Sequence, residues 1–218
     1  MGTTGSLREA KRNAFLHITM CLTDTSVSGR PLRVRRGTDM LRLECDLPDG
    51  SSGLIALATI KDGLPTGQFA MDPAILVYGG TVMNVLDQLP LRAWAHPPRD
   101  ALLCSQGAGP TRGVYHVTSP DSPSVDVIVD QVRSTWIPLL LAYSGQWNDA
   151  LDHTLAHPQE VAAPLSTATI LAFLAHRSDR MNEITSTAQR TPQFWDAREI
   201  PDIDEHIHRI EALVASCK

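Results

Sequence analysis

One stretch in the first half of the chain alternates strictly between apolar and charged residues. In Leu41-Arg-Leu-Glu-Cys-Asp-Leu47 every odd position is apolar and every even position is charged. Successive side chains of a strand point to opposite faces of a sheet, so this pattern places all the apolar side chains on one face. It predicts an antiparallel strand with one buried face and one face in water.

Further strand patterns surround this stretch, and turn residues separate them. Residues 54–60 are apolar on both faces, which indicates a central strand. Residues 68–78 read as a strand, or as a helix opened by Pro73, and residues 81–89 as a short helix or as strand and loop. Other expected strands are 32–36, 91–95, 101–105 and 113–118.

Helical patterns open the chain and fill its second half. Ser6 and Glu9 form a capping box before a helix over 7–23, and Ser122 with Pro123 starts a second helix that Pro138 should kink or end. Further helices are expected over 147–157, 164–176, 179–189 and 203–216. The 164–176 helix is apolar almost all round and should be buried, and Asp202 caps the last helix.

Strands followed by helices predict an α+β fold: an N-terminal helix, an antiparallel sheet of about five or six strands and a C-terminal helical segment. We expect residues 1–145 to form the helix, the sheet and a packing helix. Residues 146–218 are expected to form a helical subdomain on the same core.

Composition narrows the class of protein. The net charge of −5 argues against general nucleic-acid binding, and no apolar run is long enough to span a bilayer. The four cysteines include no pair at CxxC spacing, and no secretory signal is visible, so a reducing cytoplasm is expected. Abundant arginine and alanine, with three lysines, suggest a bacterial genome.

No catalytic motif stands out, and we predict no cofactor and no metal. His153 and His157 are four residues apart, a spacing that suits a metal ion, but a helix C-terminus also favours histidine. His206 and His208 lie among acidic residues but on different sides of their helix. If the protein is an enzyme, the members of its site are dispersed, and we would choose His96, Asp100 and His116.

Two groups of residues are candidates for binding a partner protein. The first is a cluster of basic residues: residues 1–43 carry eight basic and three acidic side chains, whereas residues 191–218 carry three and six. Such a charge distribution steers an acidic partner, although basic side chains also protect sheet edges. The second group is an aromatic pair between two prolines, which is either a lid on the core or an exposed anchor. The candidates are Arg33, Arg35, Arg36, Arg42, Phe194 and Trp195, with Arg8, Lys11, Arg12 and Arg30 nearby.

The stretch from Val125 to Ile184 resembles a known pattern. It contains Val-Asp-Val-Ile-Val-Asp-Gln-Val, Trp-Ile-Pro-Leu-Leu and Ala-Thr-Ile-Leu-Ala-Phe-Leu-Ala-His-Arg. With the preceding helix and sheet, this resembles a family of small bacterial domains of unknown function, which implies a fold and no activity. The order of elements through about residue 143 is also similar to that of type III secretion chaperones, which implies an acidic dimer that binds an unfolded effector segment.

From these features we expect a non-enzymatic protein-binding module, of the immunity or antitoxin type. A secretion-type chaperone and an enzyme with a dispersed site are the alternatives.

Overall fold

The computed structural model describes residues 7–61, 63–65, 68–91, 100–106, 115–118 and 122–216. It is an α+β protein with an N-terminal helix, antiparallel sheets and C-terminal helices, as the sequence predicts. The chain forms two compact units, which we describe separately. Unit 1 comprises residues 1–46, 53–75 and 105–138, and unit 2 comprises residues 47–52, 76–104 and 139–218. The predicted division at residue 145 stays a prediction.

The main sheet has six strands and follows the order β3-β4-β5-β6-β7, with β8 also paired to β6. A separate pair of short strands precedes it. The strands are β1 (Ser26–Val27), β2 (Arg30–Pro31), β3 (Arg33–Arg36), β4 (Met40–Asp46), β5 (Ser52–Ile60), β6 (Phe69–Tyr78), β7 (Ala101–Gln106) and β8 (Tyr115–Val117).

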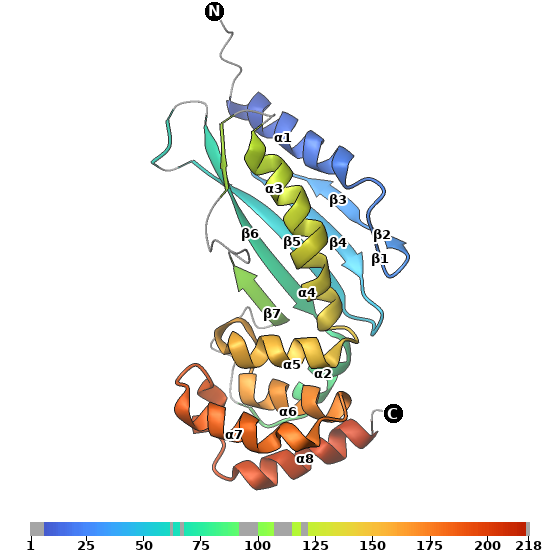
Figure 1. Ribbon diagram of the computed structural model, residues 1–218, viewed down its shortest axis with the longest axis vertical. Helices are drawn as coiled ribbons and strands as arrows, with labels where there is room; N and C mark the ends of the chain where they lie inside the picture. The colour runs from blue at the N-terminus through green and yellow to red at the C-terminus, as the bar shows by residue number, and fades with distance from the viewer. Residues whose placement is uncertain are drawn as a thin grey trace, which may run out of the picture. The chain divides into compact units, whose positions relative to one another are not determined.

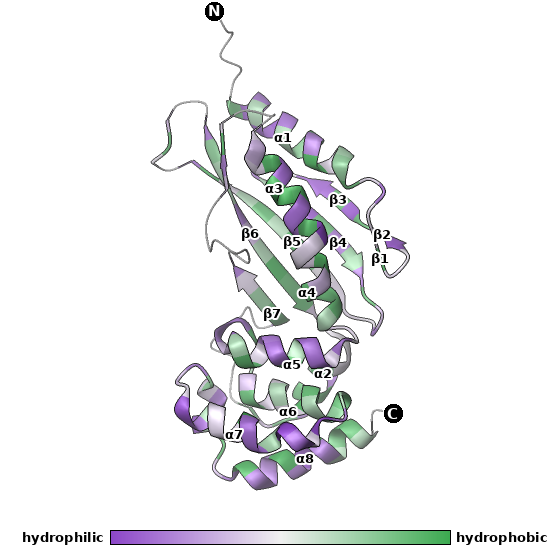
Figure 2. Cartoon of the chain, in the orientation of Figure 1, coloured by the Kyte–Doolittle hydropathy of each residue, from purple (hydrophilic) through white to green (hydrophobic). Residues whose placement is uncertain are grey.

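Strand β4 shows why the alternating pattern produces a sheet with one wet face. Leu41, Leu43 and Cys45 are fully buried, whereas the charged residues between them are exposed or half-buried. Strand β3 pairs with β4 in antiparallel register, and Figure 2 shows β3 as almost entirely hydrophilic. The predicted strands around residues 41–47 and 54–60 are confirmed.

Residues 69–78 form a strand that contains Pro73, so the strand alternative was correct and the helix alternative was wrong. The pairing of β6 with β8 covers Phe69 to Met71 and stops before Pro73, which has no amide proton to give. Residues 80–86 form the short helix α2 (Gly80–Leu86). The expected strand at 91–95 falls almost wholly outside the described residues, as does Ser6 of the expected capping box.

Helices α1 (Leu7–Cys21) and α3 (Pro123–Gln131) lie side by side in unit 1 (Figure 1). His17 on α1 contacts Asp126 on α3 through Nε2 and Oδ1, 3.3 Å apart. Helix α1 buries Ala14, Phe15 and Ile18. The hydrophobic residues of one helical face therefore form part of the core of unit 1.

The helix that begins at Pro123 does not end at Pro138. It passes through one π-helical segment, Val132–Trp136, and continues as α4 (Ile137–Ala142). The amide of Ile137 bonds to the carbonyl of Val132, five residues back, so the helix widens by one residue just before Pro138, which has no amide proton to donate. Ser122 is at the N-cap position as predicted, but its side chain makes no capping hydrogen bond.

Unit 2 is organised around α6 (Pro164–Leu174), in which nine of the eleven residues are buried. Because this helix has no wet face, other helices must cover it on all sides. It packs against α2, α5 (Trp147–Ala156), α7 (Met181–Arg190) and α8 (Ile203–Ser216), and against the short 3-10 segment Trp195–Arg198. Asp202 caps α8 as predicted, with its Oδ1 accepting from the amide of Glu205 at 3.0 Å.

No helix in the described part of the chain is long and apolar enough to cross a membrane.

Candidate functional site

The structure divides the predicted arginine cluster into paired and unpaired members. Arg33 donates two hydrogen bonds to Asp46, at 2.5 and 2.8 Å, and Arg35 forms an ion pair with Glu44 at 3.1 Å. The hydrogen bonds and the charge of Arg33 lower the pKa of the Asp46 carboxyl. Carboxylates of β4 therefore neutralise the guanidinium groups of Arg33 and Arg35, so these two arginines attract an acidic partner only weakly.

Arg36 lies on the other face of β3. Residues paired across an antiparallel ladder share a face, and Arg36 pairs with the buried Leu41 whereas Arg35 pairs with Arg42. Arg42 extends along the wet face, where its Nε lies 3.3 Å from the Met40 sulfur. Arg36 is thus the member of the predicted set that reaches the side of the sheet on which the core packs.

Arg36 lines a pocket of about 330 Å³ together with Arg8 and Arg12 of α1. The buried ring of Phe15 and the turn at residues 37–38 form the rest of its described wall. All three arginines are exposed, and none of them has an acidic partner in the described part of the chain. The pocket therefore concentrates three positive charges that nothing in the described residues compensates, and we call it the arginine pocket.

An exposed stripe on α1 continues from this pocket. Arg8, Arg12, Leu16 and Met20 are each four residues apart, so they follow one side of the helix. Leu16 is 42% exposed and Met20 67% exposed. The stripe thus joins two positive charges to two apolar side chains, and its four-residue spacing is a signal that the sequence already contains.

Lys11 does not contribute to this surface, although it belongs to the basic N-terminal group. The Lys11 residue is 3% exposed, and its Nζ donates to Asp39 at 2.5 Å and to Thr59 at 2.7 Å. Lys11 is on the same side of α1 as Ala14, Phe15 and Ile18. The helical spacing that predicts the core face of α1 also includes Lys11, so its burial was predictable.

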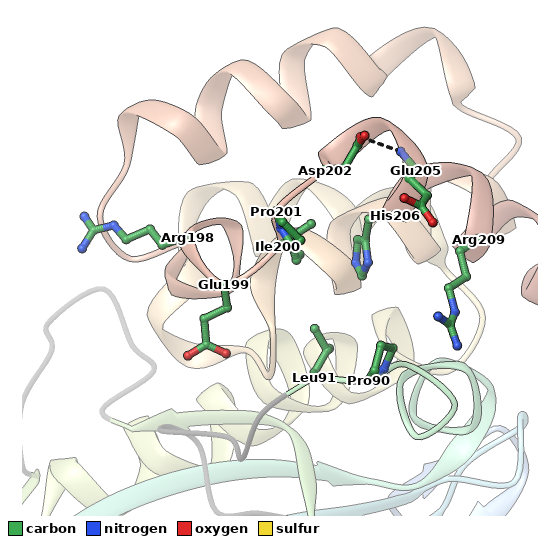
Figure 3. A pocket seen from close by; sticks show the side chains of 10 residues that line it. All are labelled: Pro90, Leu91, Arg198, Glu199, Ile200, Pro201, Asp202, Glu205, His206 and Arg209. Atoms are coloured by element: carbon green, nitrogen blue, oxygen red, sulfur yellow. Dashed lines mark hydrogen bonds between the residues drawn. The ribbon is translucent and has the colours of Figure 1, made fainter.

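A larger pocket, of about 540 Å³, lies in unit 2 (Figure 3). Its described wall comes from the chain after α2, from the segment between the 3-10 turn at 195–198 and α8, and from the first two turns of α8. The wall combines apolar side chains, such as Leu91 and Ile200, with charged groups of both signs and with His206. We call it the unit 2 pocket.

A buried hydrogen-bonded chain lies behind His206. Asp196 accepts from the backbone amides of Leu165 and Ser166 at 3.0 and 2.9 Å, and from the Ser166 hydroxyl at 3.0 Å. The Ser166 oxygen is in turn 3.0 Å from Nε2 of His206. Burial raises the pKa of Asp196, while these hydrogen bonds and the positive end of α6 favour its charged form. The order is not that of a Ser–His–Asp triad, because the serine donates to the acid and is fully buried.

The predicted histidine pairs have separate roles. The rings of His153 and His157 lie 5.0 Å apart, and His153 Nδ1 is 3.0 Å from the buried Tyr143 hydroxyl. Burial, helped by the nearby His157, lowers the pKa of His153 to about 4. His208 is exposed and bonds through Nδ1 to the backbone of Asp204, so it does not meet His206. Among the described residues no three metal-ligating side chains gather in a geometry that suits an ion.

The remaining candidates are dispersed. Phe194 is fully buried and Trp195 is half-buried, which agrees with the lid alternative. His96 lies outside the described residues. Asp100 and His116 are exposed and line neither of the two pockets. Cys45 is the small core residue that the alternating pattern predicts, and burial raises the pKa of its thiol to about 11.

Comparison of the chain with family models, with curated proteins and with solved structures finds no match in any of the three. The two resemblances noted in the sequence stay predictions.

Proposed function

We propose that the protein is a protein-binding module, of the immunity or antitoxin type, and that unit 1 binds an acidic amphipathic segment of its partner. The observation that carries this proposal is the arginine pocket: Arg8, Arg12 and Arg36 open onto one cavity with no acidic partner in the described residues. Charges of one sign held together destabilise the free protein, and an anionic partner relieves that repulsion.

The apolar part of the stripe distinguishes a protein partner from a nucleic acid. A phosphate backbone would use the arginines but would leave Leu16 and Met20 in water. Protein interfaces are enriched in arginine and methionine and bury exposed apolar side chains at their centre. We therefore expect the partner to present one continuous surface, with carboxylates that enter the arginine pocket and apolar side chains that pack on Leu16 and Met20.

The division of the arginines supplies a matched pair of variants. Arg36 and Arg35 are neighbours on β3, so replacing either with glutamine removes the same charge from the same strand. Arg36 lines the arginine pocket, whereas Arg35 is paired with Glu44 on the wet face.

The test uses a fluorescein-labelled helical peptide whose one face carries two glutamates at one end and two leucines at the other. It is titrated with the full chain and followed by fluorescence anisotropy. Arg36→Gln should weaken binding by about tenfold, because one charge-assisted contact is lost. Arg35→Gln should change it by less than about twofold, as for an exposed ion pair. Added salt should weaken binding of the wild type.

A peptide of the same composition with its leucines and glutamates scrambled is the control for simple charge attraction. Equal effects of the two arginine variants, equal binding of the scrambled peptide, or no binding at all would each contradict the proposal. The chaperone alternative requires a dimer, so a monomer in sedimentation equilibrium would remove it.

A further inference from the structure

The unit 2 pocket has a side chain whose proton can be assigned by counting hydrogen bonds. Ser166 has one hydroxyl proton, and it is donated to the Asp196 carboxylate. The Ser166 oxygen can therefore only accept at the His206 Nε2, 3.0 Å away, so this nitrogen must carry a hydrogen. Burial, with Arg209 nearby, lowers the pKa of His206, so the ring is neutral at pH 7 and its Nδ1 is a bare acceptor.

The Nδ1 atom of His206 is open to the pocket. The His206 residue is 8% exposed and lines the cavity. Among the described residues, Gln131 Oε1 is the side-chain polar atom that is both enclosed and without a hydrogen-bond partner. Nδ1 of His206 does not belong to this class, so it is accessible from the pocket. The imidazole ring of His206 is held in place through Nε2, and its Nδ1 has no partner in the described part of the chain. Nδ1 is therefore a preformed hydrogen-bond acceptor for a ligand.

Charged side chains surround this acceptor. Arg209 is three residues beyond His206 on α8, and Figure 3 shows both side chains extending toward Leu91 and Pro90. Neither Arg209 nor Glu205 forms an ion pair within the described part of the chain. A free guanidinium group suits a carboxylate, whereas Glu199 and Glu205 in the same wall oppose a dianion such as a phosphate.

We propose that the unit 2 pocket binds an α-amino acid with an aliphatic side chain. The Arg209 guanidinium binds the carboxylate, and the ammonium group donates to the His206 Nδ1 in the field of Glu205. The side chain packs against Leu91 and Ile200, the apolar part of the wall. This zwitterion uses both signs of charge in the pocket, and the cavity of about 540 Å³ is within the size range of small-molecule sites.

The test is isothermal titration calorimetry of the full chain with three probes. L-Leucine carries both groups, 4-methylpentanoate lacks the ammonium donor and leucinamide lacks the carboxylate. L-Leucine should bind, and each analogue should bind at least about tenfold more weakly, since each leaves one polar group of the site unpaired. Arg209→Gln should abolish the difference between L-leucine and leucinamide. Arg190→Gln, which removes an equal charge from the exposed end of α7, should leave all three affinities unchanged.

A second measurement determines which ring nitrogen of His206 carries the hydrogen. NMR of the histidine ring nitrogens should show His206 as the Nε2–H tautomer in the free protein, and L-leucine should shift its Nδ1 resonance. No binding of L-leucine at about 10 mM would overturn the proposal, since a Kd above that is too weak for a built site. Binding that ignores Arg209→Gln, or a free His206 protonated on Nδ1, would also overturn it. Each of these results concerns unit 2 residues alone and leaves the proposal for the arginine pocket standing.

Discussion

At the scale of single residues, this protein buries polar groups in hydrogen-bonded chains. Tyr143 is fully buried, and its hydroxyl lies 3.0 Å from Nδ1 of His153 and 2.8 Å from the Thr154 hydroxyl. On its other side, His153 Nε2 lies 3.6 Å from Glu160. The groups in such a hydrogen-bonded chain all find partners only when each titratable group is in one particular protonation state. The stability of the fold therefore depends on pH.

We expect acid to destabilise the protein through His153. The pKa of this residue is about 4 in the folded protein against about 6.5 in the unfolded chain, so the unfolded chain binds more protons between these values. The free energy of unfolding should therefore fall as the pH falls from about 6.5 to about 4, by up to roughly 3 kcal/mol. In His153→Gln this fall should be smaller, as measured by urea unfolding at pH 7.0 and pH 4.5.

His208→Gln is the control, because it removes an exposed histidine from α8. The pH dependence of that variant should match the wild type. If His153→Gln also matched the wild type, burial of His153 would not be the source of the acid sensitivity.

The roles of several residues could be predicted from the sequence, and others could not. Periodicity places Cys45 and Ile18 in the core and Asp202 at a cap, because each argument needs only neighbours along the chain. Asp196 reads as an ordinary loop acid, and only the fold brings it to Ser166, thirty residues earlier. The alternation of side chains along β3 places Arg36 and Arg35 on opposite faces of the sheet. The sequence does not show that an acidic residue pairs with Arg35 and that none pairs with Arg36 among the described residues.

At the scale of elements, side chains from distant segments cap two helices: Asp196 caps α6, and Asp49 caps α2. Helix α2 begins after Gly79, which offers no side chain, and Asp49 supplies the missing acceptor by accepting from the amide of Thr81 at 3.0 Å. The same carboxylate accepts from the amide of Ser51 at 3.1 Å. The cap thus ties the start of α2 to the loop between β4 and β5 within unit 2.

Gly80 makes this cap possible, and its replacement should be costly. Gly80 has a φ of +82°, and a Cβ there would press on the Asp49 carboxylate and lie 2.7 Å from the Ser51 Cβ. Gly80→Ala should lower the free energy of unfolding by about 2–4 kcal/mol, from a strained left-handed backbone and a displaced cap. The measurement is the midpoint shift in chemical denaturation at constant m-value.

Gly29→Ala separates the two causes. Gly29 has a similar φ of +77°, but a Cβ there meets nothing within 4 Å. It should lose only about 1–2 kcal/mol from the backbone. Equal losses at the two positions would mean that the Asp49 cap contributes nothing.

The order of most described elements could be predicted from local patterns, because strands and amphipathic helices are set by periodicity. The exceptions are places where tertiary context decides. Pro73 lies within β6, although proline favoured a helix start, and Pro138 follows a π-helical segment in place of a break. The pairing of β6 with β8 stops two residues before Pro73, and the backbone has already left the regular helical hydrogen-bond pattern before Pro138.

At the scale of the whole molecule, the chain passes back and forth between the two units. Unit 2 combines residues 139–218 with two earlier segments, residues 47–52 and 76–104. Helix α2, which packs on α6 and α8, comes from one of these earlier segments. The residues that complete the cover of α6 are therefore not all in the C-terminal part of the chain.

A fragment of residues 146–218 should consequently fail to fold as the native helical unit. Without α2, the apolar surface of α6 has no cover on one side, and burial of that surface is the main stabilising contribution available to so short a chain. Circular dichroism and thermal unfolding of the fragment should show reduced helicity and no cooperative transition. A cooperative transition would support the division at residue 145. Adding residues 76–104 through a flexible linker is the control and should restore part of the structure.

Helix α6 also has a consequence for how the protein is made. Helix α6 (Pro164–Leu174) precedes α7 and α8 in the chain, so it leaves the ribosome before two of the helices that cover it. Until α7 and α8 pack on it, this apolar segment is exposed to aggregation and available to chaperones, so the yield of folded protein should depend on chaperone supply.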